Sequence, residues 1–179
     1  MKTLIPLLFL LIALPAQAQT RLMADTKLST IRYSMIHPLH EWDGVSTRVS
    51  SVIQLAADGQ TIERVAVRVP VASFDSDNAS RDSHMIEVTD ALKYPDLRFS
   101  STSITTNGAT LTVNGVLTFH GVEKAMSFTA NRQTEGGWLR VTGSFPAELT
   151  DFGIDPPRLL GIATENKFTV SFDTRYPLN

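Results

Sequence analysis

The sequence contains no cysteine, so structures and reactions that need a thiol are excluded. Disulfide bridges, thiolate nucleophiles and thiolate-bound metal ions all depend on that side chain. Charge of one sign is also scarce, because 16 Lys and Arg stand against 18 Asp and Glu. Nucleic acids and anionic membrane surfaces attract proteins that carry basic patches. The composition therefore gives no indication of a nucleic-acid partner.

Long apolar runs are missing except at the amino terminus. Lys2 precedes an apolar stretch over residues 4–14, and Ala16 and Ala18 form a small-x-small cleavage pattern. This run is too short to span a bilayer. We therefore expect a signal peptide over residues 1–18, cleaved after Ala18, and a periplasmic or secreted protein. The mature domain, residues 19–179, then has no transmembrane segment, and the loss of Lys2 changes its formal charge from −2 to −3.

Known catalytic and metal-binding motifs are missing as well. The histidines are His37, His40, His84 and His120. On a strand, His37 and His40 would lie on opposite faces, and only a turn at Pro38 would bring them together. Ser83 stands beside His84, but no pattern places a catalytic Asp or a nucleophile elbow. We expect no cofactor, no metal and no catalytic residue. A small metal- or Ser/His-dependent enzyme is the alternative.

Alternating apolar residues predict about eight short strands. They cover residues 31–35, 45–51, 65–71, 97–104, 111–119, 126–130, 139–145 and 168–172. Asp58-Gly59 and Asn107-Gly108 are hairpin signals. Gly115 interrupts an apolar face and indicates a bulge or bend. Strands joined mostly by hairpins favour an all-β fold, an eight-stranded antiparallel lipocalin-like barrel. A β-sandwich is the rival architecture.

One helix interrupts the strands, in the connection before the fourth of them. Ser80 or Asp82 can cap it, and Pro95 ends it. Its apolar stripe consists of Met85, Val88 and Leu92. We expect this helix to bury the stripe across one mouth of the barrel.

The inward faces of the strands are almost wholly apolar. A barrel of this size is either filled by its own side chains or holds one small ligand. An acyl or prenyl tail would gain about 0.8 kcal/mol per buried CH₂. The predicted cavity lining is Phe74, Met85, Leu97, Phe99, Leu117, Phe119, Phe128, Phe145 and Phe152. Arg81 and His84 are candidate head-group contacts, since Arg offers planar donors to phosphate or carboxylate; helix capping by Asp82 and local pairing of Arg81 are the structural alternatives.

Several motifs resemble those of the YceI-like lipid-binding family over nearly the whole mature chain. They are Arg-Asp-x-His-Met at residues 81–85, Tyr-Pro-x-x-x-Phe-x-Ser from residue 94, Gly-x-Leu-Thr-x-x-Gly-Val from residue 115, and Asp-Phe-Gly from residue 151. The segment from His37 through His40 to Trp42 departs from the family pattern, as do the two prolines within residues 155–161.

This resemblance implies a lipocalin-like barrel that binds a polyisoprenoid, a quinone-type molecule or a related amphiphile. It implies no established catalytic activity. We expect a binding protein that acts as carrier or scavenger of a lipid or isoprenoid ligand. A ligand-free interaction module is a further alternative, and it predicts a filled interior with an exposed apolar patch. Pairing of two barrels into a homodimer is left open.

Overall fold

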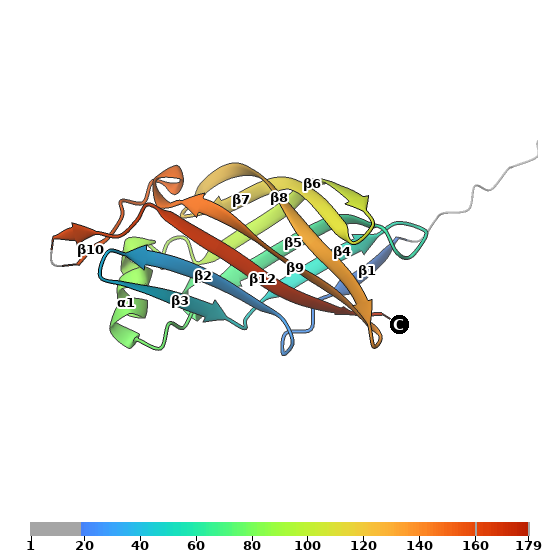
Figure 1. Ribbon diagram of the computed structural model, residues 1–179, viewed down its shortest axis with the longest axis horizontal. Coiled ribbons are helices and arrows are strands. Elements are labelled where there is room, and N and C mark those ends of the chain that lie inside the picture. Colours follow the sequence, from blue (N-terminus) through green and yellow to red (C-terminus); the bar gives the residue numbers. More distant parts are fainter. Residues whose placement is uncertain (1–18, 160, 179) are drawn as a thin grey trace, which may run out of the picture.

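The fold is built almost wholly from β-strands, as the computed structural model shows for residues 19–159 and 161–178 (Figure 1). The expected signal peptide, residues 1–18, lies outside these described residues. The strands are β1 (Thr20–Met23), β2 (Thr30–His37), β3 (His40–Ser46), β4 (Ser50–Leu55), β5 (Ile62–Pro70), β6 (Asp96–Asn107), β7 (Thr110–Phe119), β8 (Val122–Glu135), β9 (Trp138–Glu148), β10 (Arg158–Leu159), β11 (Ile162–Ala163) and β12 (Lys167–Pro177). The helix α1 (Ala79–Val88) and the 3₁₀ helices η1 (Val71–Ser73) and η2 (Leu149–Phe152) complete the described elements.

Ten strands form one antiparallel sheet in the order β1-β4-β5-β6-β7-β8-β9-β12-β2-β3. The sheet curls strongly into a half-barrel, and α1 lies at one end of it (Figure 1). The expected β-rich fold with one short helix is confirmed. The expected number of eight strands is wrong, and α1 precedes the sixth strand instead of the fourth. One large sheet also replaces the two packed sheets of the rival sandwich.

Two of the four additional strands in the described chain come from the region before β5, and the other two are β10 and β11. The predicted strand over residues 45–51 is divided, because β3 ends at Ser46 and β4 begins at Ser50. Ser46 Oγ accepts a hydrogen bond from Arg48 N at 3.1 Å and lies 2.7 Å from Ser73 Oγ. Such local side-chain bonds turn the chain out of a strand. The apolar spacing continues through this turn, so the spacing alone could not reveal the break.

The expected hairpins are confirmed by their backbone. Gly59 between β4 and β5, and Gly108 between β6 and β7, have φ of 68° and 60°. His120 and Gly121, with φ of 51° and 76°, turn β7 into β8. The left-handed conformation matches the twist of the strands that these turns connect.

Gly115 provides space for an aromatic ring in addition to marking an irregular strand pair. The register shift lies on the partner strand, between Ser101 and Ser103 of β6, opposite Gly115 and Asn114. A Cβ atom at Gly115 would lie 2.4 Å from the Phe99 ring and 2.5 Å from a backbone oxygen. The absent side chain therefore leaves room for the end of the Phe99 ring beside β7.

The amino end of α1 is capped by a residue that the sequence analysis did not name. Asn78 Oδ1 accepts a hydrogen bond from Arg81 N at 3.1 Å. Neither Ser80 nor Asp82 caps the helix. The Asp82 carboxylate instead accepts a hydrogen bond from Ser76 Oγ at 2.6 Å, which fixes the loop before the helix.

The helix also ends earlier than its apolar spacing predicts. Met85 and Val88 are half-buried on its inner face, whereas Leu92 is 93% exposed. The reason lies in the backbone after Val88: Asp90 has φ of 45°, which redirects the chain and buries Ala91 in place of Leu92.

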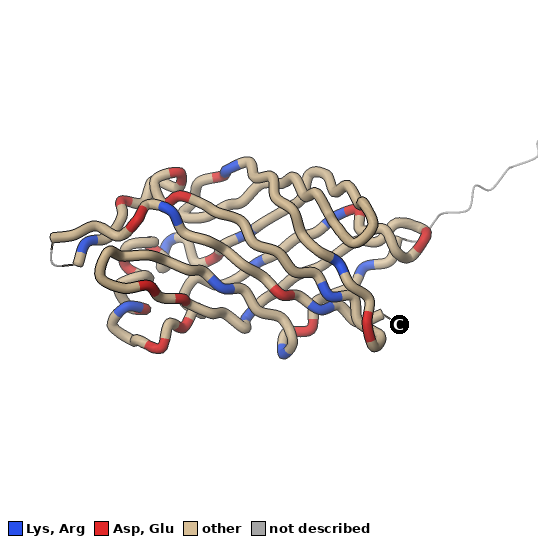
Figure 2. Tube along the Cα trace, in the orientation of Figure 1, with Lys and Arg blue, Asp and Glu red and all other residues tan. Residues whose placement is uncertain are grey.

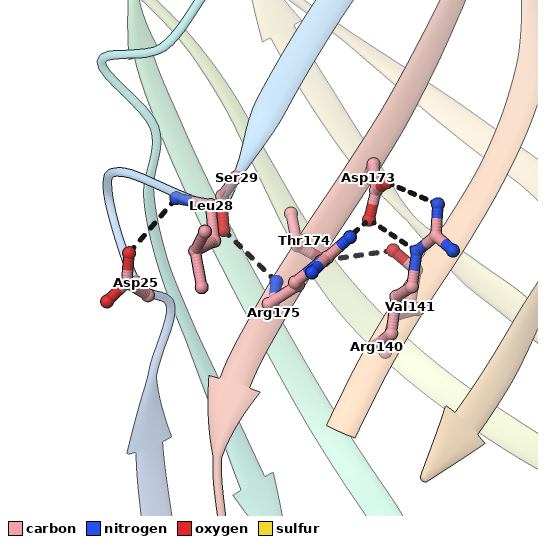
Figure 3. A network of polar contacts seen from close by, with 8 residues as sticks. All are labelled: Asp25, Leu28, Ser29, Arg140, Val141, Asp173, Thr174 and Arg175. Atoms are coloured by element: carbon pink, nitrogen blue, oxygen red, sulfur yellow. Dashed lines mark hydrogen bonds and ion pairs between the residues drawn. The ribbon is translucent and has the colours of Figure 1, made fainter. Parts of the chain in front are cut away.

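The two edges of the sheet are β1 and β3, and backbone links outside the ladder hold the curl. Asp25 N, just after β1, donates to Arg175 O of β12 at 2.8 Å. Val45 of β3 and Asp75 exchange two hydrogen bonds of 2.8 and 3.0 Å, which join the edge to the connection before α1. Figure 3 shows the surroundings of Arg175, where Ser29 Oγ accepts a hydrogen bond from Arg175 N.

Lys and Arg residues are interspersed with Asp and Glu residues over the fold (Figure 2). Three ion pairs of the described residues link neighbouring strands, and one of them joins Arg140 of β9 to Asp173 of β12 through bonds of 2.9 and 2.6 Å (Figure 3). Apolar side chains of the strands face inward and form one core. The site described next lies in this core, at the end covered by α1.

Candidate functional site

An apolar cavity lies between α1 and the curled sheet. Its volume is about 110 Å³, measured to the centres of water molecules that would fit inside. A single water needs only about 10–15 Å³ on this measure. The lining is Tyr33, Met35, Trp42, Val71, Phe74, Arg81, His84, Met85, Val88, Thr89, Leu97, Phe119, Leu149, Ile154, Pro157, Phe168 and Val170. We call this space the first cavity.

A second apolar cavity of about 70 Å³ on the same measure adjoins the first. Leu97 and Val170 line both spaces, so these two side chains form the junction between them. Phe128 lies at the centre of the aromatic group around the second cavity, stacked on Phe145 with ring centroids 4.8 Å apart. The interior therefore contains two adjoining apolar spaces, each bordered by aromatic rings.

The β2–β3 hairpin positions the polar wall of the first cavity. Tyr33 and Met35 point inward from β2, and Trp42 pairs with Met35 across the hairpin. Gly44 leaves room for the Tyr33 ring, since a Cβ atom there would lie within 3 Å of it. Phe74 meets the same ring edge-to-face, with centroids 5.4 Å apart. The orientation of Tyr33 is thus fixed on two sides.

Polar groups gather at the α1 side of the first cavity. The Arg81 guanidinium lies over the Trp42 ring, 5.1 Å from its centroid, which is a cation–π contact. Burial raises the pKa of Tyr33, so its hydroxyl stays protonated at neutral pH. His84 is 53% exposed and lies 3.7 Å from Glu87, at the solvent side of the lining.

The predicted lining residues fall into two groups and one exception. Phe74, Met85, Leu97 and Phe119 line the first cavity, and Leu97, Phe99, Leu117, Phe128 and Phe145 line the second. The candidate head-group residues Arg81 and His84 lie on the first. Phe152 lines neither cavity. It is fully buried behind Phe119, with ring centroids 5.5 Å apart. That any of these residues contacts a ligand stays a prediction.

Much of the lining that β2, β3 and β12 contribute was not predicted from the sequence. Tyr33, Trp42, Phe168 and Val170 are the chief examples. The alternation within β2 and β12 was visible in the sequence and could have identified Tyr33, Phe168 and Val170. Trp42 offered no such signal, because its position depends on the pairing of β3 with β2.

His37 and His40 come together because β2 turns into β3 at Pro38, and they do not lie on opposite faces of one strand. Their ring centroids are 5.4 Å apart. His37 is buried and hydrogen-bonded at both nitrogens: Leu39 N donates to Nδ1 at 3.2 Å, and Nε2 lies 3.1 Å from Ile162 O. His37 thereby fastens the β10–β11 hairpin to the tip of β2.

Histidine, cysteine, aspartate and glutamate side chains of the described residues form no group of three that could hold a metal ion. Ser83 and His84 are both exposed on α1. His120 Nδ1 lies 2.8 Å from Phe152 O, so this ring donates to a backbone carbonyl. Among the described residues, no helix has the length and apolar character to cross a membrane.

Fold and cavity together define a half-barrel β-protein with an apolar interior beneath a single helix. Residues 22–176 match the family model of the YceI-like domain, and the chain belongs to this family. The resemblance that the sequence motifs indicated is thereby confirmed.

Curated relatives and solved structures agree with this assignment. A UPF0312 protein of Pseudomonas fluorescens (strain SBW25) is 37% identical over 143 residues, which cover 74% of this chain and 71% of the relative. One from Pseudomonas putida (strain F1) is 35% identical over the same lengths. Burkholderia cenocepacia BcnA superposes with a TM-score of 0.76 at 18% identity, covering 85% of this chain and 98% of BcnA. A polyisoprenoid binding domain from Saccharophagus degradans gives 0.70 at 12% identity, covering 90% and 100%. At these identities the solved structures show the fold.

Proposed function

We propose that this protein binds one long apolar or amphiphilic molecule, with its tail in the first cavity and its head near Arg81 and His84. The observation that carries the proposal is the hollow beneath α1, which is lined almost entirely by apolar side chains. Burial of an apolar chain there gains about 0.8 kcal/mol per CH₂ before ordering costs. A charged metabolite without a partner would lose several kcal/mol on entering the same space.

Comparison with relatives supports the choice of an isoprenoid tail. The Saccharophagus degradans domain of the same fold is described as polyisoprenoid-binding. A prenyl chain is long, narrow and uncharged, which suits two adjoining apolar cavities. We therefore propose a polyisoprenoid-like lipid as ligand and a role as carrier or scavenger. The alternative of a ligand-free module needs a filled interior, and the two cavities count against it.

Geranylgeraniol is a suitable probe for this proposal. Wild-type protein freed of lipid should take up one molecule, as measured by native mass spectrometry and by a fluorescence titration of its tryptophans. Phe119→Asp should abolish uptake, because Phe119 is 7% exposed and faces the first cavity. Val122→Asp is the matched control. Val122 pairs with Phe119 across the β7–β8 turn, but it is 37% exposed and lies outside both linings.

A second variant keeps the test decisive if Phe119→Asp fails to fold. Met85→Trp adds bulk from α1 into the first cavity, and Met85 is only half-buried, so the sheet is left intact. It should reduce uptake strongly while circular dichroism stays unchanged. Wild-type uptake by folded Met85→Trp protein, or no uptake by the wild type, would contradict the proposal.

A further inference from the structure

Trp42 carries an indole N–H that makes no hydrogen bond of standard geometry among the described residues, although it lies close enough to the Tyr33 hydroxyl to oppose the rise in the pKa of that group. Its indole Nε1 atom is buried, although the ring as a whole is partly exposed. A buried donor without an acceptor keeps the cost of losing its water. Because Trp42 lines the first cavity, a molecule bound there can supply the acceptor. The unpaired donor therefore points to the chemistry of a ligand.

Arg81 brings a positive charge to the same wall. Its guanidinium lies over the Trp42 ring, and no carboxylate of the described residues pairs with it. The neighbouring Asp82 carboxylate accepts hydrogen bonds from Ser76 Oγ at 2.6 Å and from Ser76 N at 3.2 Å. Asp82 thus fixes the loop before α1 and does not satisfy the donors of Arg81.

Tyr33 adds a third donor beside the other two. Its hydroxyl is protonated at neutral pH, as its raised pKa requires. The charges of Asp82 and Asp43 both reach Tyr33, but Asp82 accepts hydrogen bonds from Ser76 and Asp43 is paired with Arg32. No Asp or Glu stands among the described residues that line the first cavity. The lining residues therefore supply one cation and two hydrogen-bond donors but no carboxylate that could pair with them.

We propose that the first cavity selects amphiphiles whose head group carries an anionic oxygen, as a phosphate or a carboxylate does. The inference rests on the proposed function, because it concerns the head of the molecule whose tail lies in the cavity. Arg81 supplies the opposite charge, and Trp42 Nε1–H and the Tyr33 hydroxyl donate to the remaining lone pairs. An ammonium head would be repelled by Arg81 and would leave both donors unpaired.

Ligands with matched tails test the preference on the wild-type protein. Geranylgeranyl phosphate should bind about tenfold more tightly than geranylgeraniol, and geranylgeranylamine more weakly than either. The phosphate advantage should shrink as salt is added. The affinities of oleate and oleyl alcohol make the same comparison for a carboxylate head group. Tighter binding of the anionic ligand than of its alcohol, in either pair, supports the proposal. Equal affinities within both pairs, or tighter binding of the amine, would overturn it, while uptake of the alcohols would still uphold the proposed function.

Single substitutions then assign the preference to side chains. Arg81→Gln should bring the phosphate-to-alcohol affinity ratio close to one, whatever its effect on the affinity for geranylgeraniol itself. Trp42→Phe and Tyr33→Phe should each lower the ratio a few-fold. Arg64→Gln is the matched control, because it removes the same charge from an exposed position outside both cavities. A wild-type ratio in Arg81→Gln protein would show that this arginine does not read the head group.

Discussion

Asp96 is a buried carboxylate at the start of β6 that is held by two arginines. Its side chain is 4% exposed, and its Oδ2 lies 2.9 Å from Arg68 Nε and 3.0 Å from Arg98 Nη2. The hydrogen bond from Arg68, and with it that from Arg98, lowers the pKa of Asp96 below the ordinary 3.8. A carboxyl group whose pKa is lower in the folded protein than in the unfolded chain stabilises the fold at every pH above its pKa in the unfolded chain. That stability is lost as the pH falls through the folded value.

Replacement of this carboxylate should therefore have a pH-dependent cost. Asp96→Asn is expected to lower the free energy of unfolding by about 1.5–3 kcal/mol at neutral pH, because two charge-assisted hydrogen bonds are lost. The deficit should begin to narrow below pH 3.8, where the carboxyl of the unfolded chain becomes protonated, and should be lost as the pH falls through the lower pKa of the folded protein. Urea unfolding at neutral and acidic pH measures it, with Asp77→Asn as an exposed control. A deficit that stays constant with pH would assign the effect to packing.

Single residues also show how far the candidate site could be predicted. Most apolar lining residues followed from strand alternation and Met85 from helical spacing, and all but Phe152 line at least one of the two cavities. Phe152 belongs to η2, which packs its ring behind Phe119, and no alternation rule gives the direction of that side chain. Trp42 was noticed as unusual but given no role. Its contact with Arg81 joins β3 to α1, and no local pattern encodes such a contact between distant segments.

At the scale of elements, α1 depends on its cap, because none of its residues is fully buried. Asn78→Ala should lower stability by about 1 kcal/mol and expose the first turn to hydrogen exchange, since Arg81 N loses its acceptor. Ser80→Ala is the matched control, because Ser80 is the position that sequence spacing favoured and it makes no cap contact. Hydrogen-exchange mass spectrometry of the helix compares the two variants. If both variants lost the same hydrogen-exchange protection in the first turn of α1, Asn78 would not be the residue that caps the helix.

The strands that the sequence analysis did not find have a common physical cause. β1 is a four-residue edge strand that depends on its pairing with β4, and β10 and β11 contain two residues each. Their local patterns are too short to separate from loops. Long strands with hairpin turns, such as β7 and β8, were predictable because turn residues and alternation indicated the same structure.

At the scale of the whole molecule, the curl of the sheet determines what the interior can hold. A closed barrel of eight strands would enclose one hollow, whereas the ten-stranded half-barrel encloses two that adjoin at Leu97 and Val170. The division lies at Leu97 and Val170, whereas Phe99, Phe128 and Phe145 line only the second cavity. Strand alternation predicted that these rings point inward. It could not predict whether they fill the space or border it, because that depends on the spacing of the strands around the curl.

The junction between the cavities should control how binding depends on tail length. In the wild type, geranylgeraniol should bind more tightly than geraniol, because its additional carbons can pass Val170 into the second cavity, at about 0.8 kcal/mol per buried CH₂ before ordering costs. Val170→Phe fills the junction, so it should remove this advantage and change geraniol affinity little. Val71→Phe is the matched control, since Val71 lines only the first cavity and its enlargement should weaken both alcohols.

Each enlargement is expected to cost about 1–3 kcal/mol of stability, so urea unfolding must first establish that both variants are folded at the temperature of the titrations. An undiminished length dependence in folded Val170→Phe protein would mean that the tail does not cross the junction. The second cavity would then be a packing space of the half-barrel, and the first cavity alone would set the size of the ligand.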